Sequence, residues 1–370
     1  MLGSNRDAVL PQNVLLQKPT YAAYVHHFIL IGGLGDIELD IAQISRQALR
    51  LCTNLRSFSW VYAEHDLRSS SELTHDLDIL RSLGRLKHLV IRTAAGINEE
   101  AWTKLTQLPG LQSIELWSAR THTPLFPGWS AKLRESLVSL ELGSSFRRDM
   151  QLAVLSELPK LKHLRVRGLS NAFIIKILEV LPNLESLYTE YLIASHGRNH
   201  PPFKTSLKHL TVATCIPNQA FAEPLWEWIL QVLPRPSLET LHIQTVSPIT
   251  VPRKFLRDLT KIHHDTLQEV NVGRMEMTAD DIAYLCTTCP NLQSVSCSLD
   301  GTVDDLDAVV GRALNVSSLH VTFRRELVFV REREGVRPEQ PREWMLRQKS
   351  KLRALQINEV IYEVSRTMGT

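Results

Sequence analysis

The chain has 370 residues, of which 44% are hydrophobic and 22% charged, and its net charge at pH 7 is +3. This composition is ordinary for a folded protein, and the net charge is too small to indicate nucleic-acid binding by itself. The five cysteines are too few for a disulfide framework, so we expect a reducing compartment. No signal peptide is visible at the start, and the apolar stretch 28–34 is too short to cross a bilayer. We therefore expect an intracellular protein, cytoplasmic or nuclear, that binds neither membrane nor nucleic acid.

A short apolar sequence motif is repeated along most of the chain. It reads Leu-x-x-Leu-x-Val, with Ile or Leu also found at the last place, and successive copies begin roughly 27 residues apart, within the range of leucine-rich repeats. The clear copies begin at Leu86, Leu111, Leu137, Leu161, Leu207, Leu238, Leu267 and Leu292. Weaker copies begin at Val25, Leu55, Leu184, Val316 and Leu352.

Each copy predicts one β-strand. Side chains alternate between the two faces of a strand, so the fourth and sixth residues of a copy, such as Leu89 and Ile91, share one apolar face. A single unit cannot cover this face, whereas neighbouring units stacked side by side can. The third, fifth and seventh residues then point to the opposite side of the sheet.

The segments between the strands show helical periodicity. The clearest are residues 99–108, 152–158, 174–181, 282–289 and 303–314. A proline such as Pro109 or Pro182 follows several of them, where it ends the helix and turns the chain toward the next strand. The sequence thus predicts an α/β leucine-rich-repeat solenoid of about 12 to 13 repeats, with a curved parallel sheet on the concave face and helices on the convex face.

We expect four parts along the chain. They are an N-terminal segment 1–20, the solenoid 21–323, a charged basic insertion of loop and helix 324–351, and the last repeat strand with a C-terminal tail 352–370. Pro, Gly and His also predict irregular loops at 120–131 and 194–205. Ten Lys and Arg against five acids within 324–353 indicate either a solvated loop and helix or a basic contact surface for an acidic partner.

Candidate sites for chemistry are few. Cys286-x-x-Cys289 is half of a zinc site, but no second pair exists in the chain. The pairs that begin at His26 and His263 have no ligand or nucleophile partner at a useful spacing. Residues 31–36 resemble a dinucleotide-binding loop but lack its third glycine, so we expect a loop between repeats. We predict a non-enzymatic protein with no catalytic residue, no cofactor and no metal.

The outward row of the middle strands carries the best candidate for a binding site. Strands about 4.8 Å apart would bring two aromatic residues, two arginines, a histidine and three acids into one patch. These are Glu115, Trp117, Glu141, His163, Arg165, Arg167, Tyr188 and Glu190. Aromatic and arginine side chains are frequent anchors of interfaces, which predicts a protein-binding hot spot. The alternative interpretation is that the arginines simply pair with the acids across strands.

Several passages resemble the repeat region of fungal F-box and leucine-rich-repeat proteins. They are VLLQKP at 14–19 with YVHHFIL at 24–30, ALRLCTNLRSF at 48–58, and CPNL at 289–292. The resemblance covers nearly the whole chain. It implies that the repeats hold a protein substrate while an upstream F-box docks a Skp-type adaptor of a cullin ubiquitin ligase. Only Leu10-Pro11 is reminiscent of an F-box here, so a scaffold or regulator without a ligase role is the alternative.

Overall fold

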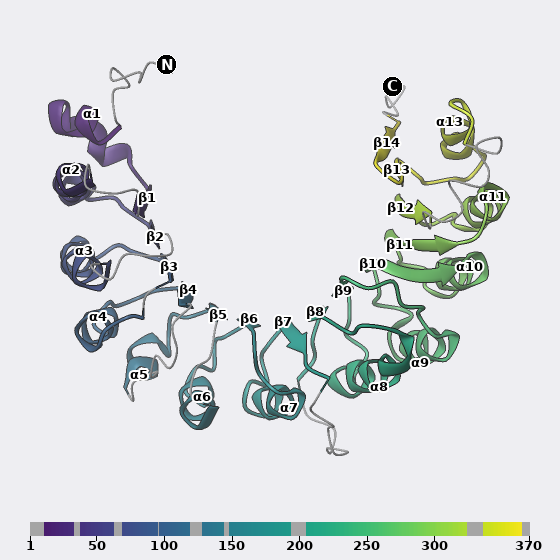
Figure 1. Cartoon of the computed structure of the whole chain (residues 1–370), viewed down its shortest axis with the longest axis horizontal. Helices are drawn as coiled ribbons and strands as arrows, with labels where there is room; N and C mark the ends of the chain where they lie inside the picture. The colour runs from purple at the N-terminus through teal and green to yellow at the C-terminus, as the bar shows by residue number, and fades with distance from the viewer. Residues whose placement is uncertain are drawn as a thin grey trace. The chain divides into compact units, whose positions relative to one another are not determined.

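The chain forms two compact units, Met1–Gly168 and Leu169–Thr370, in each of which strands alternate with helices (Figure 1). The computed structural model describes residues 11–32, 38–62, 69–94, 96–118, 128–143, 148–193, 205–323 and 336–364. In both units the helices lie along one side of the strands and leave the opposite side uncovered (Figure 1). We call this uncovered side the open face.

The described part of the first unit contains a parallel sheet whose strand order follows the chain. Its strands are β1 (His27–Gly32), β2 (Ser57–Tyr62), β3 (His88–Thr93), β4 (Ser113–Ser118), β5 (Ser139–Gly143) and β6 (His163–Val166). Leu89, Ile114, Leu140 and Leu164 lie in register on β3 to β6, and each is at most 2% exposed. The repeated leucine thus forms a continuous apolar row under the helices, as stacking of one-strand units requires.

The helices of the first unit lie on one side of its strands (Figure 1). They are α1 (Pro11–Gln17), the 3-10 helix η1 (Pro19–Tyr24), α2 (Glu38–Leu51), α3 (Ser69–Leu83), α4 (Glu99–Leu105), α5 (Trp129–Leu133) and α6 (Arg148–Ser156). The α4 helix shows how the sequence determines the start and the packing of such a helix. The side chain of Asn98 caps it by accepting a hydrogen bond from the Ala101 N–H at 2.8 Å. Its Trp102 side chain is buried edge-on against Trp129, with ring centroids 6.3 Å apart.

The second unit continues the same pattern and ends in a hairpin. Its described strands are β7 (Ser186–Tyr191), β8 (His209–Thr214), β9 (Thr240–Thr245), β10 (Glu269–Thr278), β11 (Ser294–Asp300), β12 (Ser318–Phe323), β13 (Ala354–Ile357) and β14 (Val360–Glu363). The strands β7 to β13 are parallel, whereas β14 runs antiparallel to β13. Asn358 makes the turn between them in a left-handed conformation with φ of 55°, which asparagine adopts more readily than most residues.

The helices of the second unit again lie on one side of its strands. They are α7 (Asn171–Val180), the 3-10 helix η2 (Gln219–Phe221), α8 (Glu223–Val232), α9 (Arg253–His263), α10 (Ala279–Thr288), α11 (Val303–Arg312) and α13 (Gln340–Met345). A capping box between Thr302 and Asp305 starts α11, and the Thr278 side chain caps α10.

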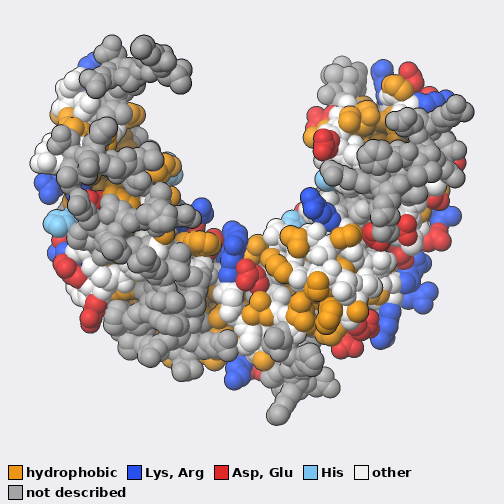
Figure 2. All heavy atoms as spheres, in the orientation of Figure 1, with side chains coloured by type: hydrophobic (Ala, Val, Ile, Leu, Met, Phe, Trp, Pro, Cys, Tyr) orange, Lys and Arg blue, Asp and Glu red, His pale blue; other side chains and the backbone are white. Residues whose placement is uncertain are grey.

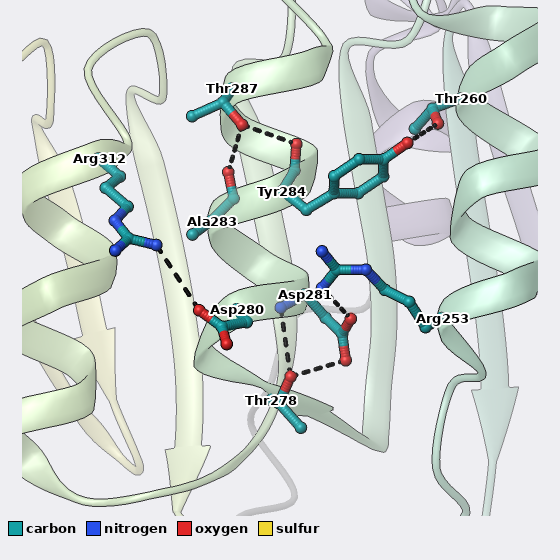
Figure 3. A network of polar contacts seen from close by, with 9 residues as sticks. All are labelled: Arg253, Thr260, Thr278, Asp280, Asp281, Ala283, Tyr284, Thr287 and Arg312. Atoms are coloured by element: carbon teal, nitrogen blue, oxygen red, sulfur yellow. Dashed lines mark hydrogen bonds and ion pairs between the residues drawn. The ribbon is translucent and has the colours of Figure 1, made fainter.

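Polar side chains join three of these helices to one another (Figure 3). Arg253 of α9 pairs with Asp281 of α10 at 2.5 Å and lies over the Tyr284 ring, 4.6 Å from its centroid. Arg312 of α11 pairs with Asp280 of α10 at 3.6 Å. Consecutive repeats are therefore tied together at the helices as well as at the strands.

The structure confirms the predicted repeat fold. All thirteen predicted copies form strands, and each strand begins at the third residue of its copy. The five predicted helices are α4, α6, α7, α10 and α11, with ends that differ from the prediction by a few residues. The β14 strand was not predicted. No helix in the described ranges combines the length and apolar character that a bilayer crossing needs.

Other expectations fall wholly or partly outside the described residues. These are the predicted loops at 120–131 and 194–205, the loop at 31–36 and the basic insertion 324–351. In the described part of these ranges, α5 begins at Trp129, inside the predicted loop 120–131. The α13 helix lies in the second half of the insertion 324–351. The four-part division of the chain stays a prediction.

Candidate protein-interaction surface

A row of charged side chains crosses the open face of the first unit. Glu115 of β4 is in register with Glu141 of β5, and Glu141 is in register with Arg165 of β6. Arg92 of β3 belongs to the same row, although its partner in register on β4 is Trp117. We call these four residues, Arg92, Glu115, Glu141 and Arg165, the charged row. Its two acids lie on the inner strands and its two arginines on the outer ones.

The charged row is paired internally. Arg92 donates to the Glu115 carboxylate, and Arg165 Nε lies 3.3 Å from Glu141 Oε1. The two acids are mostly covered, with side chains 17% and 19% exposed, whereas those of Arg92 and Arg165 are 53% and 38% exposed. Pairing across strands, the alternative considered from the sequence, therefore does hold for Arg165. It leaves the arginines as the more accessible members of each pair.

The environment of Glu141 combines opposing effects. Burial, and after it the neighbouring carboxylate of Glu115, raise the pKa of Glu141 above its usual value. Three guanidinium groups act in the opposite direction: Arg165, Arg92 and Arg167. The arginines on both sides thus offset part of the cost of placing two carboxylates side by side.

Trp117 is the large aromatic residue of this surface. It is 37% exposed and lies in register with Gly143 of β5. A Cβ placed on Gly143 would lie 1.9 Å from Trp117 Nε1 and 2.0 Å from Cδ1. The indole therefore occupies the space that any other side chain at position 143 would need, and it rests against the neighbouring strand with part of its surface open to solvent.

The remaining predicted residues fall into two groups. His163, exposed, begins β6, and Arg167 follows the last residue of that strand. Tyr188 and Glu190 lie on β7 of the second unit, where the Tyr188 hydroxyl donates to Gln244 Oε1 at 3.2 Å. Within the first unit the structure therefore brings together Glu115, Trp117, Glu141, His163, Arg165 and Arg167.

Sequence reasoning missed two members of this surface. Arg92 was not among the predicted residues, although it is the seventh residue of the copy that begins at Leu86, the place that Trp117 takes in the next copy. Gly143 takes the same place in the copy that begins at Leu137. The available signal was a glycine in the seventh place of the copy that follows the one with Trp117. Because glycine has no side chain, it leaves room for the indole to approach the neighbouring strand closely.

Residues with possible metal or redox chemistry have a packing role in the structure. Burial raises the pKa of the Cys286 thiol to about 12 and that of the Cys289 thiol to about 11, so both stay protonated at neutral pH. His263 is fully buried, and its Nδ1 accepts a hydrogen bond from the Leu238 N–H at 3.3 Å. In the described ranges no three His, Cys, Asp or Glu residues form a group that could hold a metal ion.

Charges of both signs are mixed among the described residues of the face that Figure 2 shows. Figure 2 shows Lys and Arg side chains directly beside Asp and Glu side chains on the face in view. Ion pairs of this kind include Lys104 with Asp78 at 2.6 Å and Lys208 with Glu185 at 3.3 Å. This mixture of signs agrees with the small net charge of +3.

Comparison with known proteins gives low similarities. No family model and no curated sequence matches the chain. Three solved structures that match are an internalin (inlF) from Listeria monocytogenes str. 4b F2365, a chain of the Rad7 and Elc1 complex in yeast, and the leucine-rich repeat-containing protein LegL7 from Legionella pneumophila. Their sequence identities are 17%, 13% and 12%, and their TM-scores are 0.41, 0.45 and 0.35. The matches cover 87%, 79% and 83% of this chain and 91%, 69% and 87% of the matched chains.

Proposed function

We propose that the first unit binds a protein through the open face of β3 to β6, with Trp117 as the anchor of the interface. The observation that carries this proposal is the placement of the Trp117 indole, which is held against Gly143 and is still 37% exposed. A partly exposed tryptophan that is already packed against a neighbouring strand loses little conformational freedom when a partner covers it, and tryptophan is enriched among the residues that dominate binding energy.

The charged row supplies the specificity of the proposed interface. Its arginines and acids give a pattern of positive, negative, negative and positive charge from β3 to β6. A partner with complementary charges is favoured over one with the same charges, because like charges brought together at an interface cost several kcal/mol. His163 and Arg167 are further proposed contacts of the first unit, and Tyr188 and Glu190 are proposed as separate contacts on the second unit.

The first hypothesis for the biological role is an F-box-like substrate-recognition module. It is supported by the passages that resemble fungal F-box and leucine-rich-repeat proteins, such as the CPNL sequence that precedes β11. In this case the bound protein is a substrate for ubiquitination, and a Skp-type adaptor and a cullin associate with the complex. The second hypothesis is a repeat scaffold or regulator with the same surface and no ligase role.

Both hypotheses describe a non-enzymatic protein. The charged row consists of two ion pairs and contains no nucleophile with an adjacent base. Recognition of a protein is the function that this arrangement can perform.

Affinity purification from native cells with three versions of the chain tests the proposal. The wild type is compared with Trp117→Ala and with Phe221→Ala, which removes another exposed aromatic side chain, 49% exposed, from η2. Proteins retained by the wild type and by Phe221→Ala but lost with Trp117→Ala are the expected partners. An unchanged set of proteins with Trp117→Ala would overturn the proposal.

The same purification distinguishes the two hypotheses. A Skp-type adaptor and a cullin in the wild-type sample support the substrate receptor. A partner that depends on Trp117, captured without them, supports the scaffold or regulator.

A further inference from the structure

A polar groove lies in the second unit, where the chain enters the strands β11, β12 and β13. Its volume is about 480 Å³. The described residues that line it come from three successive repeats: Pro290, Asn291, Gln293, Asn315, Ser317, Lys351 and Arg353. Gln293, Ser317 and Arg353 each take the second place of their repeat, immediately before the strand begins.

Backbone hydrogen bonds fix the floor of this groove. The Ser317 N–H donates to the Gln293 carbonyl and the Arg353 N–H donates to the Ser317 carbonyl, both at 2.8 Å. The Ser317 hydroxyl also donates to the Gln293 carbonyl at 3.1 Å, and the Asn291 amide donates to the Asp265 carbonyl at 2.7 Å. The groove is thus built on the ladder that joins neighbouring repeats.

The charge of the groove has one sign. Its described lining includes two cations, Lys351 and Arg353, and no carboxylate. Among the described residues neither cation has an acidic partner, whereas Arg312 and Arg347 pair with Asp280 and Asp307. The side-chain amides of Gln293 and Asn315, which also line the groove, can donate hydrogen bonds to an anion.

The two cations point in the same direction. Lys351 and Arg353 are exposed, while Leu352 between them is 2% exposed and faces the core. Neighbouring strands lie about 4.8 Å apart, so three strands span roughly 10 Å, the length of about three residues of extended peptide. The groove is therefore the right size for a short extended segment that carries acidic side chains.

We propose that this groove binds an acidic protein segment in extended conformation, with Lys351 and Arg353 pairing with its Asp or Glu side chains. The charge complementarity of the lining carries this assignment, and the amides of Gln293 and Asn315 supply donors along the segment. The site is separate from the proposed Trp117 interface, which lies in the first unit. Each of the two proposals can therefore fail without the other.

Fluorescence anisotropy with a labelled oligoglutamate peptide at low ionic strength tests the proposal on the full chain. The variant Lys351→Glu/Arg353→Glu reverses both cations. The control Lys254→Glu/Arg257→Glu makes the same change in net charge at two exposed residues of α9. Each surface pair contributes modestly, so we expect the groove variant to weaken binding roughly tenfold and the control to change it by less than about twofold.

Further ligands and a second groove variant make the outcome of the binding experiment decisive. An oligoserine peptide of the same length must not bind, and Lys351→Gln/Arg353→Gln must weaken binding even if the charge reversal perturbs folding. Equal weakening by the groove variant and the α9 control would show non-specific attraction and overturn the site. Absence of oligoglutamate binding, or tighter binding of an oligothymidylate at the same residues, would also overturn it.

Discussion

The indole of Trp117 lies directly against Gly143, its partner in register on the next strand. A Cβ at position 143 would come within 1.9 Å of the ring nitrogen. We expect Gly143→Ala to displace the ring and to weaken partner binding about as much as Trp117→Ala does. The dissociation constant of the partner and the intrinsic tryptophan fluorescence of the chain measure the two effects. Wild-type affinity in Gly143→Ala would show that the position of the ring is unimportant.

The two faces of β6 predict different costs for neighbouring substitutions. Leu164 is 2% exposed within the apolar row, so Leu164→Ala should destabilise the chain by about 2–5 kcal/mol. Arg165 faces the open side with a side chain 38% exposed, and Arg165→Ala should change stability by less than about 1 kcal/mol. Denaturant titration of both variants gives the comparison. Equal losses would mean that the faces of the strand are assigned incorrectly.

The cysteines differ sharply in their expected reactivity. Cys215 is exposed, whereas the other four, Cys52, Cys286, Cys289 and Cys297, are buried and have thiol pKa values raised by burial. Only the thiolate reacts readily with disulfide reagents. We expect one thiol to react rapidly with Ellman's reagent in the native chain and the rest to react only after unfolding. Substitution of Cys215 by Ser should abolish the rapid phase, and a rapid phase that persists contradicts this assignment.

Buried His263 makes the stability depend on pH. Burial lowers its pKa from 6.5 to about 4, so the folded chain favours the neutral imidazole. Protons therefore bind first to the unfolded state as the pH falls below 6.5, and stability is lost until the pH reaches about 4, by about 3 kcal/mol in total. We expect His263→Gln to remove this loss and His264→Gln, at the exposed neighbour, to retain it.

The measurement is the free energy of unfolding of each variant relative to wild type between pH 7 and pH 4. The difference is needed because burial raises the pKa of Asp76 to about 6, which gives a contribution of the opposite sign over part of this range. An equal pH dependence in His263→Gln and in the wild type would exclude His263 as the cause.

The positions of the strands were predictable because each repeat carries the same local pattern. The alternation of buried and outward residues in a motif such as LKHLVI depends only on the geometry of a strand. The regular spacing of the repeats then places successive strands in register. For the same reason the sequence could place Glu115 beside Glu141 and Glu141 beside Arg165 before the structure was known.

Other features depend on contacts that the repeat does not specify. The pairing of Arg92 with Glu115 joins the seventh residue of one copy to the fifth residue of the next, so it depends on the direction of a long side chain. The β14 strand has only four residues and depends on the turn at Asn358. The groove at Lys351 and Arg353 arises where three turns meet, and no single repeat contains it.

The dissociation constant of the captured partner for Trp117→Ala and Phe221→Ala tests the central claim most directly. The proposed interface predicts a loss of affinity of at least about tenfold for Trp117→Ala, equivalent to about 1.4 kcal/mol, and no significant change for Phe221→Ala. Equal affinity of both variants and the wild type would contradict an interface centred on Trp117 and would move the search for the binding surface to other parts of the chain.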